Sequence, residues 1–293
     1  MKVAVYGRAL EANRSQYVQQ LFEKMSLSGM EPVIFEPLYN YLKDTVRVSR
    51  PFSLFNTYEE LFGKVHFLFS IGGDGTLLET LTFVRDSDIP VMGINTGRLG
   101  FLSSISKEEI DFAIDAVVRN KYMIDKRSLL CLETPGMQLF GKVNYALNDI
   151  TIHKSDSSSM ISVHAWLDGQ FLNNYYADGL IISTPTGSTA YSLSCGGPIV
   201  MPSSENFIIT PVAPHNLNVR PIIISDQSVL KLNVDSRGAK SMITLDSRSE
   251  IIDADIEITI RKENFGINIV KLENHDFLTT LRDKLNWGVD RRH

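Results

Sequence analysis

Gly72-Gly73-Asp74-Gly75-Thr76 is the segment of the sequence with the clearest capacity for chemistry. It follows the apolar run Val65–Ile71 and precedes Leu77–Val84, whose apolar spacing fits a helix. Adjacent glycines let a backbone approach a ligand closely. A helix that starts after them directs unpaired N–H groups toward an anion. We therefore predict a phosphate-binding turn made by Gly72, Gly73, Gly75 and Thr76.

Asp74 sets this turn apart from a simple phosphate cradle, because a carboxylate there would repel a phosphate. Asp74 could help to hold a divalent cation. It could instead accept the proton of an attacking hydroxyl beside the phosphate. A plain strand–helix turn with Asp74 as the helix cap is the third interpretation.

Other glycine-rich segments fit nucleotide-binding patterns less well. Gly136–Val143 resembles a Walker A loop but ends in Val, which has no hydroxyl for Mg²⁺, and no helical pattern follows. We predict a hairpin loop there. Gly7 stands alone after the first strand, and Gly93–Gly100 has the wrong glycine spacing, which argues against a hydride-transferring dinucleotide enzyme.

A second polar segment, Ala177–Val200, combines small hydroxyl side chains with four glycines. This composition suits a ligand with many hydrogen-bonding edges, such as a nucleoside, and Tyr191 could stack on its base or ribose. Asn148-Asp149 could bind the two hydroxyls of a ribose. The alternatives are an ordinary loop between strands for the first segment and an Asx turn for the second.

The cysteines and histidines show no pattern of a reactive centre. Cys131 and Cys195 are too few for a disulfide scaffold. Cys195 has no local base, so we expect a packed thiol. The histidines lack a metal-binding spacing, so we assign no metal-ligating residues.

Strand-like and helix-like segments alternate along the first third of the chain, which predicts a parallel α/β domain. After about residue 125 nearly every segment looks like a strand, and Asp168-Gly169 marks a tight hairpin. We predict an N-terminal α/β domain over 1–125, a mostly β domain over 126–275, and a C-terminal helical segment, 276–293, that joins the first domain. The predicted strands of the second domain are Leu129–Glu133, Tyr145–His153, Ile161–Leu167, Gln170–Tyr176, Gly179–Ser183, Pro221–Ser225, Val229–Val234, Ser241–Leu245 and Ile256–Arg261.

Composition limits the classes of function. Of the 293 residues 43% are hydrophobic and 22% charged, which suits a chain with real cores. The 29 basic and 34 acidic residues give a formal net charge of −5, which argues against a general nucleic-acid binder. Neither a signal peptide nor an apolar run of membrane-spanning length is visible, so we expect a cytoplasmic protein.

Taken together, the motifs resemble those of the NAD kinase family, whose members use ATP to phosphorylate the adenosine 2′-hydroxyl of NAD. GGDGT alone is shared with some lipid kinases and, as GGDGS, with phosphofructokinases, but the long serine- and glycine-rich block is far more specific. The matching segments, in the family's order, are Gly72–Thr76, Asn95–Leu102, Asn148-Asp149, Asp178–Val200 and Pro211–Pro221.

The resemblance implies a fold, a site and roles for single residues. It implies an N-terminal α/β domain with a parallel sheet, a C-terminal β-sandwich-like domain, and a site in the crevice between them. Asp74 would be the catalytic base, and Gly75 would line the phosphate site. The residues implied to contact NAD are Asp74, Gly75, Asn148, Asp149, Asp178, Thr189, Ala190, Tyr191, Ser192, Leu193 and Ser194.

Mg²⁺ is expected on the triphosphate of ATP, because an acidic protein needs charge compensation there. The family also implies a homo-oligomer, a dimer or a tetramer. One departure is Asp246-Ser247-Arg248, where family members often carry Asp-Gly-Gln. A lipid kinase and a dinucleotide sensor without transfer activity are the alternative functions.

Overall fold

The computed structural model describes residues 1–8, 14–97, 99–155, 160–235, 240–252, 256–273 and 275–286. Position 98 of the Asn95–Leu102 motif and positions 287–293 of the C-terminal segment lie outside the described residues. The chain forms two compact units, here called unit 1 (1–126 with 267–293) and unit 2 (127–266). In the described part of the chain, no helix has both the length and the apolar character that crossing a bilayer requires.

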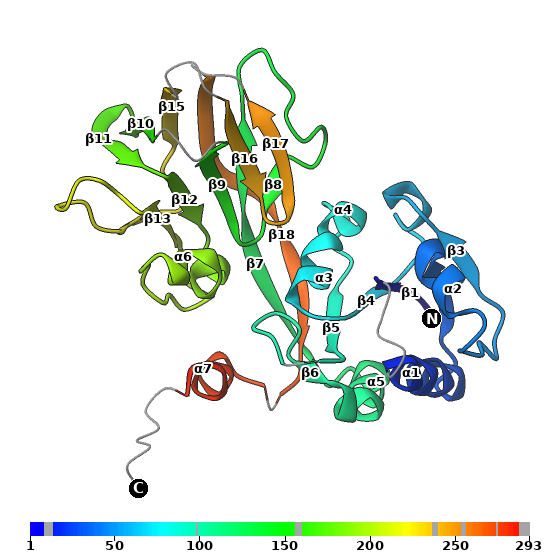
Figure 1. The fold of residues 1–293 in the computed structure, drawn as a ribbon. Helices are drawn as coiled ribbons and strands as arrows, with labels where there is room; N and C mark the ends of the chain where they lie inside the picture. The colour runs from blue at the N-terminus through cyan, green and yellow to red at the C-terminus, as the bar shows by residue number, and fades with distance from the viewer. Residues whose placement is uncertain are drawn as a thin grey trace, which may run out of the picture. The chain divides into compact units, whose positions relative to one another are not determined.

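Unit 1 contains the parallel sheet that the alternating pattern predicts (Figure 1). Its strand order is β3-β2-β1-β4-β5, and β6 and the end of β18 (Ile256–Lys271) also pair with β5, all in parallel. Strands β1, β4 and β5 are almost wholly buried, as expected of parallel strands covered on both faces. The strand bounds are β1 Lys2–Gly7, β2 Glu31–Phe35, β3 Ser53–Phe55, β4 Phe67–Ile71, β5 Val91–Asn95 and β6 Ile105–Ser106.

Helices cover this sheet through apolar faces that the sequence spacing reveals. In α1 (Ser15–Leu27), Val18, Leu21, Phe22 and Met25 are buried in one core with β1 and β4. Helix α5 (Ile110–Val118) contacts α1, and the two lie side by side in Figure 1. The other helices of unit 1 are α2 Glu36–Leu42, α3 Asp74–Glu79, α4 Leu81–Val84 and α7 Phe277–Leu285, with 3₁₀ turns at Tyr58–Glu60 and Lys107–Glu109.

The strand order of unit 1 reverses direction between β1 and β4. From β1 the chain builds outward through β2 and β3, and it then returns to place β4 on the other side of β1. Gly7 at the end of β1 pairs with Ile71 at the end of β4. The loops that follow these strands therefore leave the sheet side by side at its carboxyl edge, where open α/β sheets bind ligands.

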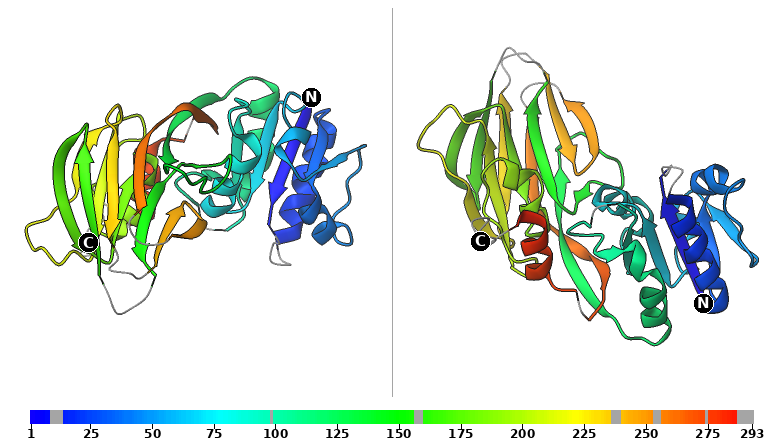
Figure 2. Two further views of the ribbon diagram at one scale, coloured as in Figure 1. Left: turned by 90° about the horizontal axis from the view of Figure 1, so that it is seen from above. Right: turned by 60° about the horizontal axis from the view of Figure 1, so that its bottom comes forward.

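Unit 2 is a sandwich of two antiparallel sheets, as the fold resemblance implies; Figure 2 gives two further views of its strands. One sheet has the order β11-β10-β15-β18, and β7 and β8 extend it, whereas the other has the order β14-β13-β12-β9-β16-β17. Side chains from both sheets share one core, which includes Val163 on β10 and Ile182 on β12. The bounds are β7 Met123–Glu133, β8 Tyr145–Ala146, β9 Asp149–Lys154, β10 Ile161–Leu167, β11 Gln170–Ala177, β12 Gly179–Ser183, β13 Asn206–Val212, β14 Ile222–Ser225, β15 Leu230–Asp235, β16 Ser241–Leu245 and β17 Arg248–Ile252, with a 3₁₀ turn at Thr186–Thr189 and helix α6 at Tyr191–Ser194.

Two turns of unit 2 confirm the predictions from local sequence. Asp168 and Gly169 join β10 to β11 with φ angles of 50° and 81°, as a tight hairpin requires. The Walker-like segment Gly136–Val143 lies in the connection between β7 and β8, which pair antiparallel, so it is a hairpin loop.

The prediction of one strand over Tyr145–His153 is wrong. The structure has β8 at Tyr145–Ala146 and a separate β9 that starts at Asp149. The break occurs because the backbone N–H groups of Leu147 and Asn148 donate to the side chain of Asp246.

Candidate active site

The glycine turn after β4 has one crowded and one open side. Gly72 has a φ angle of +150°, and a Cβ there would lie 2.3 Å from Oγ1 of Thr76. A Cβ on Gly73 or Gly75 would meet no atom within 4 Å. The turn is therefore closed on the side of Thr76 and leaves open space at Gly73 and Gly75, where a phosphate could approach the backbone.

Asp74 is the first residue of α3, but its side chain does not cap that helix. The N-cap is Gly73, which makes no side-chain cap bond. The Asp74 carboxylate accepts N–H bonds from Phe101 (2.8 Å to Oδ2), Leu102 (3.2 Å to Oδ1) and Ser103 (2.8 Å to Oδ1). Three donors fix the carboxylate, and Oδ2, which takes only one of these bonds, can still accept another. This geometry favours the proton-acceptor interpretation over the helix cap.

Gly100 allows the following loop to wrap around Asp74. A Cβ at position 100 would lie 1.7 Å from Oδ1 of Asp74, so any other residue there would displace the carboxylate from this position. The N–H of Gly97 donates to Oδ1 of Asn95 at 2.8 Å, which turns the chain at the start of the same motif. The Gly72–Thr76 and Asn95–Leu102 segments thus form one structure around Asp74, a connection that the sequence alone does not show.

Arg8 is a residue beside the glycine turn that the sequence reasoning missed. It follows β1 at the same sheet edge, and its Nε donates to Oε2 of Glu79 at 2.6 Å. Glu79 is the last residue of α3 and also accepts the hydroxyl of Tyr6 at 2.9 Å. A guanidinium bound in this way keeps further N–H donors for another acceptor. The sequence signal that could have identified Arg8 is its position directly after β1, at the point where the strand order of the sheet reverses.

In unit 2, Asp246 fixes the backbone of the Asn148-Asp149 pair. Its carboxylate accepts the N–H groups of Leu147 at 2.9 Å, Asn148 at 2.7 Å and Asp149 at 3.3 Å. The carbonyl of Asn148 accepts the N–H of Thr184 at 2.9 Å. A Cβ on Gly187 would lie only 2.1 Å from that carbonyl oxygen. Asn148-Asp149 and the serine- and glycine-rich block therefore meet in one place.

Asp149 is buried and carries a proton more readily than an exposed aspartate. Burial, with the negative charge of Asp246 as a second cause, raises the pKa of Asp149 to about 7. The hydroxyl of Thr151 donates to its Oδ1 at 2.8 Å and opposes this shift. Burial also raises the pKa of Asp246, whereas its three N–H donors and Arg248 oppose that change.

Tyr191 and Asp178 lie near the Asn148-Asp149 pair in unit 2. Tyr191 on α6 is 40% exposed, and its ring lies 5.6 Å from that of His153. His153 lies on β9, the strand that starts with Asp149, and pairs with Gly179, the residue after Asp178. Burial raises the pKa of Tyr191; Cys195 adds to this effect, and the charges of Asp149 and Asp178 contribute further. Oδ1 of Asp178 pairs with Nζ of Lys154 at 2.6 Å. The structure therefore brings Asp149, Asp178 and Tyr191 together.

The serine- and glycine-rich block separates into buried and accessible residues. Ser192 is fully buried, and its Oγ lies 2.8 Å from Oγ1 of Thr210, so we do not retain it as a substrate contact. Ser188 is likewise buried and bonded to Pro185 and Val200. The predicted contact residues that stay at least partly exposed are Thr189, Ala190, Tyr191, Leu193 and Ser194.

Arg248, the last residue of the segment Asp246-Ser247-Arg248, supports the backbone. Its guanidinium donates to the carbonyl of Tyr145 at 2.6 Å and also to that of Val143. Burial lowers the pKa of Arg248, and the charge of Asp246 opposes this change. Arg248 therefore helps to hold the segment that leads into Asn148-Asp149.

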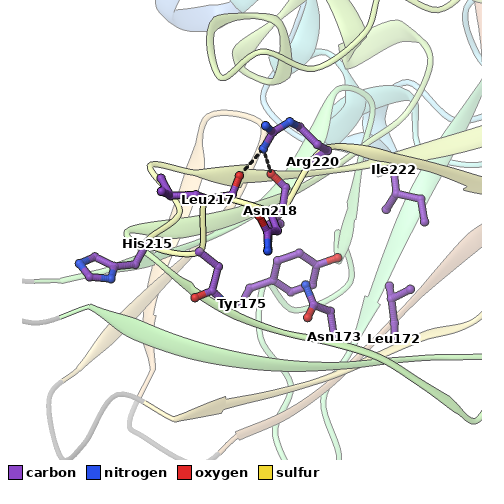
Figure 3. A pocket seen from close by; sticks show the side chains of 10 residues that line it. Leu172, Asn173, Tyr175, His215, Leu217, Asn218, Arg220 and Ile222 are labelled. Atoms are coloured by element: carbon purple, nitrogen blue, oxygen red, sulfur yellow. Dashed lines mark hydrogen bonds between the residues drawn. The ribbon is translucent and has the colours of Figure 1, made fainter.

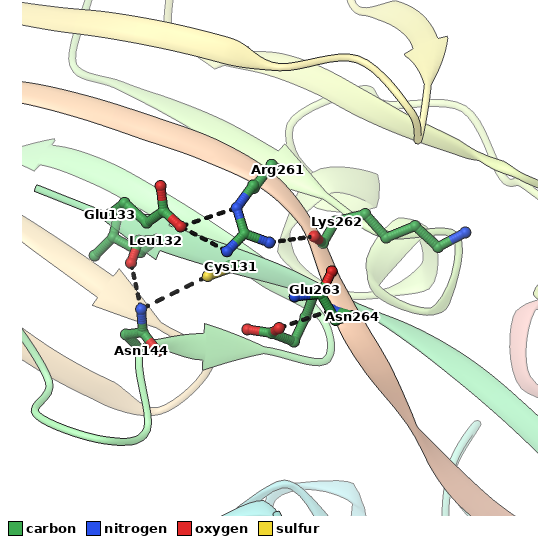
Figure 4. A network of polar contacts seen from close by, with 8 residues as sticks. All are labelled: Cys131, Leu132, Glu133, Asn144, Arg261, Lys262, Glu263 and Asn264. Carbon is green, nitrogen blue, oxygen red and sulfur yellow. Dashed lines mark hydrogen bonds and ion pairs between the residues drawn. The ribbon is translucent and has the colours of Figure 1, made fainter. Parts of the chain in front are cut away.

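Both cysteines are free thiols, Cys131 buried and Cys195 half-buried. Burial raises the pKa of Cys131 to about 12, with Glu263 as a further cause, and Asn144 contacts its sulfur at 3.6 Å (Figure 4). Beside it, Arg261 pairs with Glu133 at 2.6 Å. Burial also raises the pKa of Cys195. Neither thiol has the lowered pKa of a nucleophile, in agreement with the prediction for Cys195.

A hollow of about 740 Å³ on unit 2 lies apart from these residues. Strand β11 and the segment from His215 to Ile222 line it, and Figure 3 shows their side chains. Arg220 at its rim donates to the carbonyls of Leu217 at 2.6 Å and Val219 at 2.8 Å. None of the predicted site residues lines this hollow.

Comparisons with known proteins identify the family. A sequence model described as the ATP-NAD kinase N-terminal domain matches residues 16–122, and one described as the ATP-NAD kinase C-terminal domain matches residues 147–272. The NAD kinase of Cytophaga hutchinsonii is 46% identical over 294 residues and 100% of both chains. The chain belongs to the ATP-NAD kinase family.

Further relatives agree with this result. The NAD kinase of Bacteroides fragilis strain ATCC 25285 is 43% identical over 100% of both chains. A crystal structure of an Archaeoglobus fulgidus NAD kinase in complex with ATP has a TM-score of 0.76 at 26% identity, over 98% of this chain and 99% of that one. Yeast NADH kinase complexed with NADH has a TM-score of 0.89 at 23% identity, over 100% and 89%, and so shows the same fold.

Membership of this family makes the chain a kinase that uses ATP to phosphorylate NAD and form NADP. The lipid-kinase and sensor alternatives are thereby set aside. The α/β domain with a parallel sheet and the β-sandwich-like domain that the resemblance implied are confirmed.

Proposed function

We propose that the enzyme transfers the γ-phosphate of ATP to the 2′-hydroxyl of the adenosine ribose of NAD, with Asp74 as the general base. The observation that carries this proposal is the Asp74 carboxylate, which three backbone N–H groups hold while Oδ2 keeps room for another donor. A ribose hydroxyl is a poor nucleophile at neutral pH, so a fixed proton acceptor beside the phosphate is what the reaction needs.

The transfer balances without a further reactant. Asp74 takes the proton of the 2′-hydroxyl as its oxygen bonds to the γ-phosphorus. The bond between that phosphorus and the oxygen bridging to the β-phosphate breaks, and ADP leaves. NADP, ADP and a proton are the products. Placement of the groups and stabilisation of charge supply most of the acceleration in such reactions.

Residues of unit 1 would bind the phosphates of ATP. The open space at Gly73 and Gly75 supports an approach of the phosphates to the backbone of the turn. Arg8 at the neighbouring strand end would add a positive charge, held in place by Glu79. Within the described residues no group of three His, Cys, Asp or Glu side chains could hold a metal ion. Mg²⁺ would enter bound to the triphosphate of ATP, whose charge it neutralises.

Residues of unit 2 would bind NAD. Asn148, Asp149 and Asp178 offer an amide and two carboxylates for ribose hydroxyls, and the partly exposed ring of Tyr191 offers a stacking surface. The accessible residues Thr189, Ala190, Leu193 and Ser194 flank Tyr191 in the sequence and would provide further contacts to NAD. We also propose that the enzyme is located in the cytoplasm, a reducing compartment in which two free thiols are expected. We propose further that it assembles as a homodimer or homotetramer.

A coupled assay tests this function. The protein is mixed with ATP, Mg²⁺ and NAD, and an NADP-specific dehydrogenase reports the product. NADP formation that requires all three components supports the proposal, whereas binding of NAD without turnover would contradict it. The position of the new phosphate is read by ³¹P NMR, which separates a 2′-monoester from a 3′-monoester.

A further inference from the structure

Phe101 connects the C-terminal helix to Asp74. Its backbone N–H donates to Oδ2 of Asp74 at 2.8 Å. Its ring lies 6.1 Å from the ring of Phe277, the first residue of α7, and 5.9 Å from Nζ of Lys284 on the same helix. One residue therefore contacts the proposed base through its backbone and α7 through its side chain.

Helix α7 has a capped start and one fully buried leucine. Asp276 caps it by accepting the N–H of Thr279 at 2.8 Å, and Leu281 is 1% exposed. Just before the helix, Nε2 of His275 lies 2.9 Å from Oε1 of Glu109. Glu109 also accepts the N–H of Ser106 at 2.9 Å, close after the segment that holds Asp74. His275 and Glu109 therefore connect the start of the helix to the segment that follows the Asp74-binding loop.

The loop has incomplete packing on the side of α7. A hollow of about 460 Å³ lies there. The loop residues Gly97, Leu99, Ser104 and Ser106 line one part, and Asp276, Thr279, Thr280 and Asp283 line another. Beside this open space, the rings of Phe101 and Phe277 form a direct contact between the loop and the helix.

We infer that Phe277 is a positioning residue for the reaction. Its ring supports Phe101, and this support keeps the N–H groups of residues 101–103 directed at Asp74. The inference rests on the proposed role of Asp74 as the base. Phe277 is not among the residues proposed to bind ATP or NAD, so its loss should change the rate of transfer rather than the affinity. A displacement of a reacting group by about 1 Å can cost about 100-fold in rate.

The test compares F277A with F277L and L278A. Leu278 is the adjacent residue on α7 and is 47% exposed, so L278A removes a largely solvent-exposed apolar side chain from the same helix and leaves the Phe277 ring in place. For F277A we expect kcat to fall about tenfold, as for a partial loss of positioning, while KM for ATP and for NAD stays within about twofold. F277L should recover most of the loss, and L278A should match the wild type. All assays run at about 15 °C, so that a less stable variant remains folded.

The same substitution made in the D74N enzyme separates a positioning role of Phe277 from a general structural role. In D74N there is no base to position, so adding F277A should lower the residual kcat no further. An F277A enzyme with wild-type kcat would overturn the inference. So would equal losses in F277A and L278A, or a further fall of kcat in the D74N background. If D74N alone keeps normal turnover, the proposed function of Asp74 fails first, and that result is read from D74N without reference to Phe277.

Discussion

Asp246 accepts the backbone N–H of Asn148, a residue 98 positions earlier in the chain, at 2.7 Å. Asp246 has a φ angle of 52° and lies in the turn between β16 and β17. Its carboxylate thus fixes the start of β9 from a neighbouring hairpin. This explains how an asparagine and an aspartate can be presented side by side at the start of β9.

Removal of this carboxylate should weaken NAD binding. We expect D246A to raise KM for NAD about tenfold, because three backbone N–H groups lose their acceptor and Asn148-Asp149 loses its support. D246N keeps one oxygen for Asn148 and Asp149 and should lie between D246A and the wild type. Steady-state kinetics measure the effect, and an unchanged KM in D246A would show that the pair does not bind NAD.

Asp149 should make the stability of the protein depend on pH. Its pKa of about 7 in the fold exceeds the value near 3.9 of an unfolded chain. Between these values the folded state holds a proton that the unfolded state lacks, so stability falls as pH rises from about 4 to 7 and stays low above that. D149N should therefore match the wild type at about pH 4 or below and melt several degrees higher at about pH 8.

Calorimetry of both proteins across this range of pH checks the sign. The hydroxyl of Thr151 can still donate to the side-chain amide oxygen that D149N introduces, so the local hydrogen bond is kept. Melting curves of wild type and D149N that move in parallel from acidic to alkaline pH would contradict the raised pKa.

Arg8 should affect ATP more than NAD. We expect R8A to raise KM for ATP about tenfold, the order expected for loss of one charge-assisted hydrogen bond to phosphate, and to leave KM for NAD within about twofold. R119A is the matched control, because Arg119 is exposed and follows the C-terminal end of α5. Equal changes in the KM of both substrates, or equal effects of R8A and R119A, would argue against a phosphate contact.

Divalent metal should act through the nucleotide. EDTA should abolish turnover, and Mg²⁺ or Mn²⁺ should restore it, because charge on the triphosphate must be neutralised during transfer. Calorimetric titration of the protein with Mg²⁺ alone should show no tight site, in line with the absence of a suitable ligand cluster among the described residues. Full turnover in EDTA would refute the charge argument.

Local sequence signals predicted most of the fold. The strands at Ile161–Leu167, Gly179–Ser183 and Ser241–Leu245 have the predicted bounds, because alternation and turn residues act over short range. Strand β18 runs on to Lys271, past the predicted end at Arg261, through a polar stretch that only pairing in the sheet explains. Strand β13 also went unpredicted, and its last residues lie inside the Pro211–Pro221 motif.

The candidate site was predictable as separate motifs but not as an arrangement. Glycine turns and carboxylates have sequence signatures, so Asp74 and Asn148-Asp149 could be singled out. Their partners are backbone N–H groups at residues 101–103 and the side chain of Asp246, far away in the chain. A backbone donor has no signature of its own, and so the support of each carboxylate emerges only from the structure.

The kinetics of D74N test the central claim most directly. Asn has the size of Asp and keeps an acceptor for the loop N–H groups, but it cannot take a proton from a hydroxyl. We predict that D74N stays folded with a somewhat lower melting temperature, because only one side-chain oxygen remains for the three N–H donors. It should keep its affinity for NAD within a few-fold and lose about 10²–10⁴ in kcat, the range of general-base catalysis. Near-normal turnover in a folded, NAD-binding D74N enzyme would contradict the account.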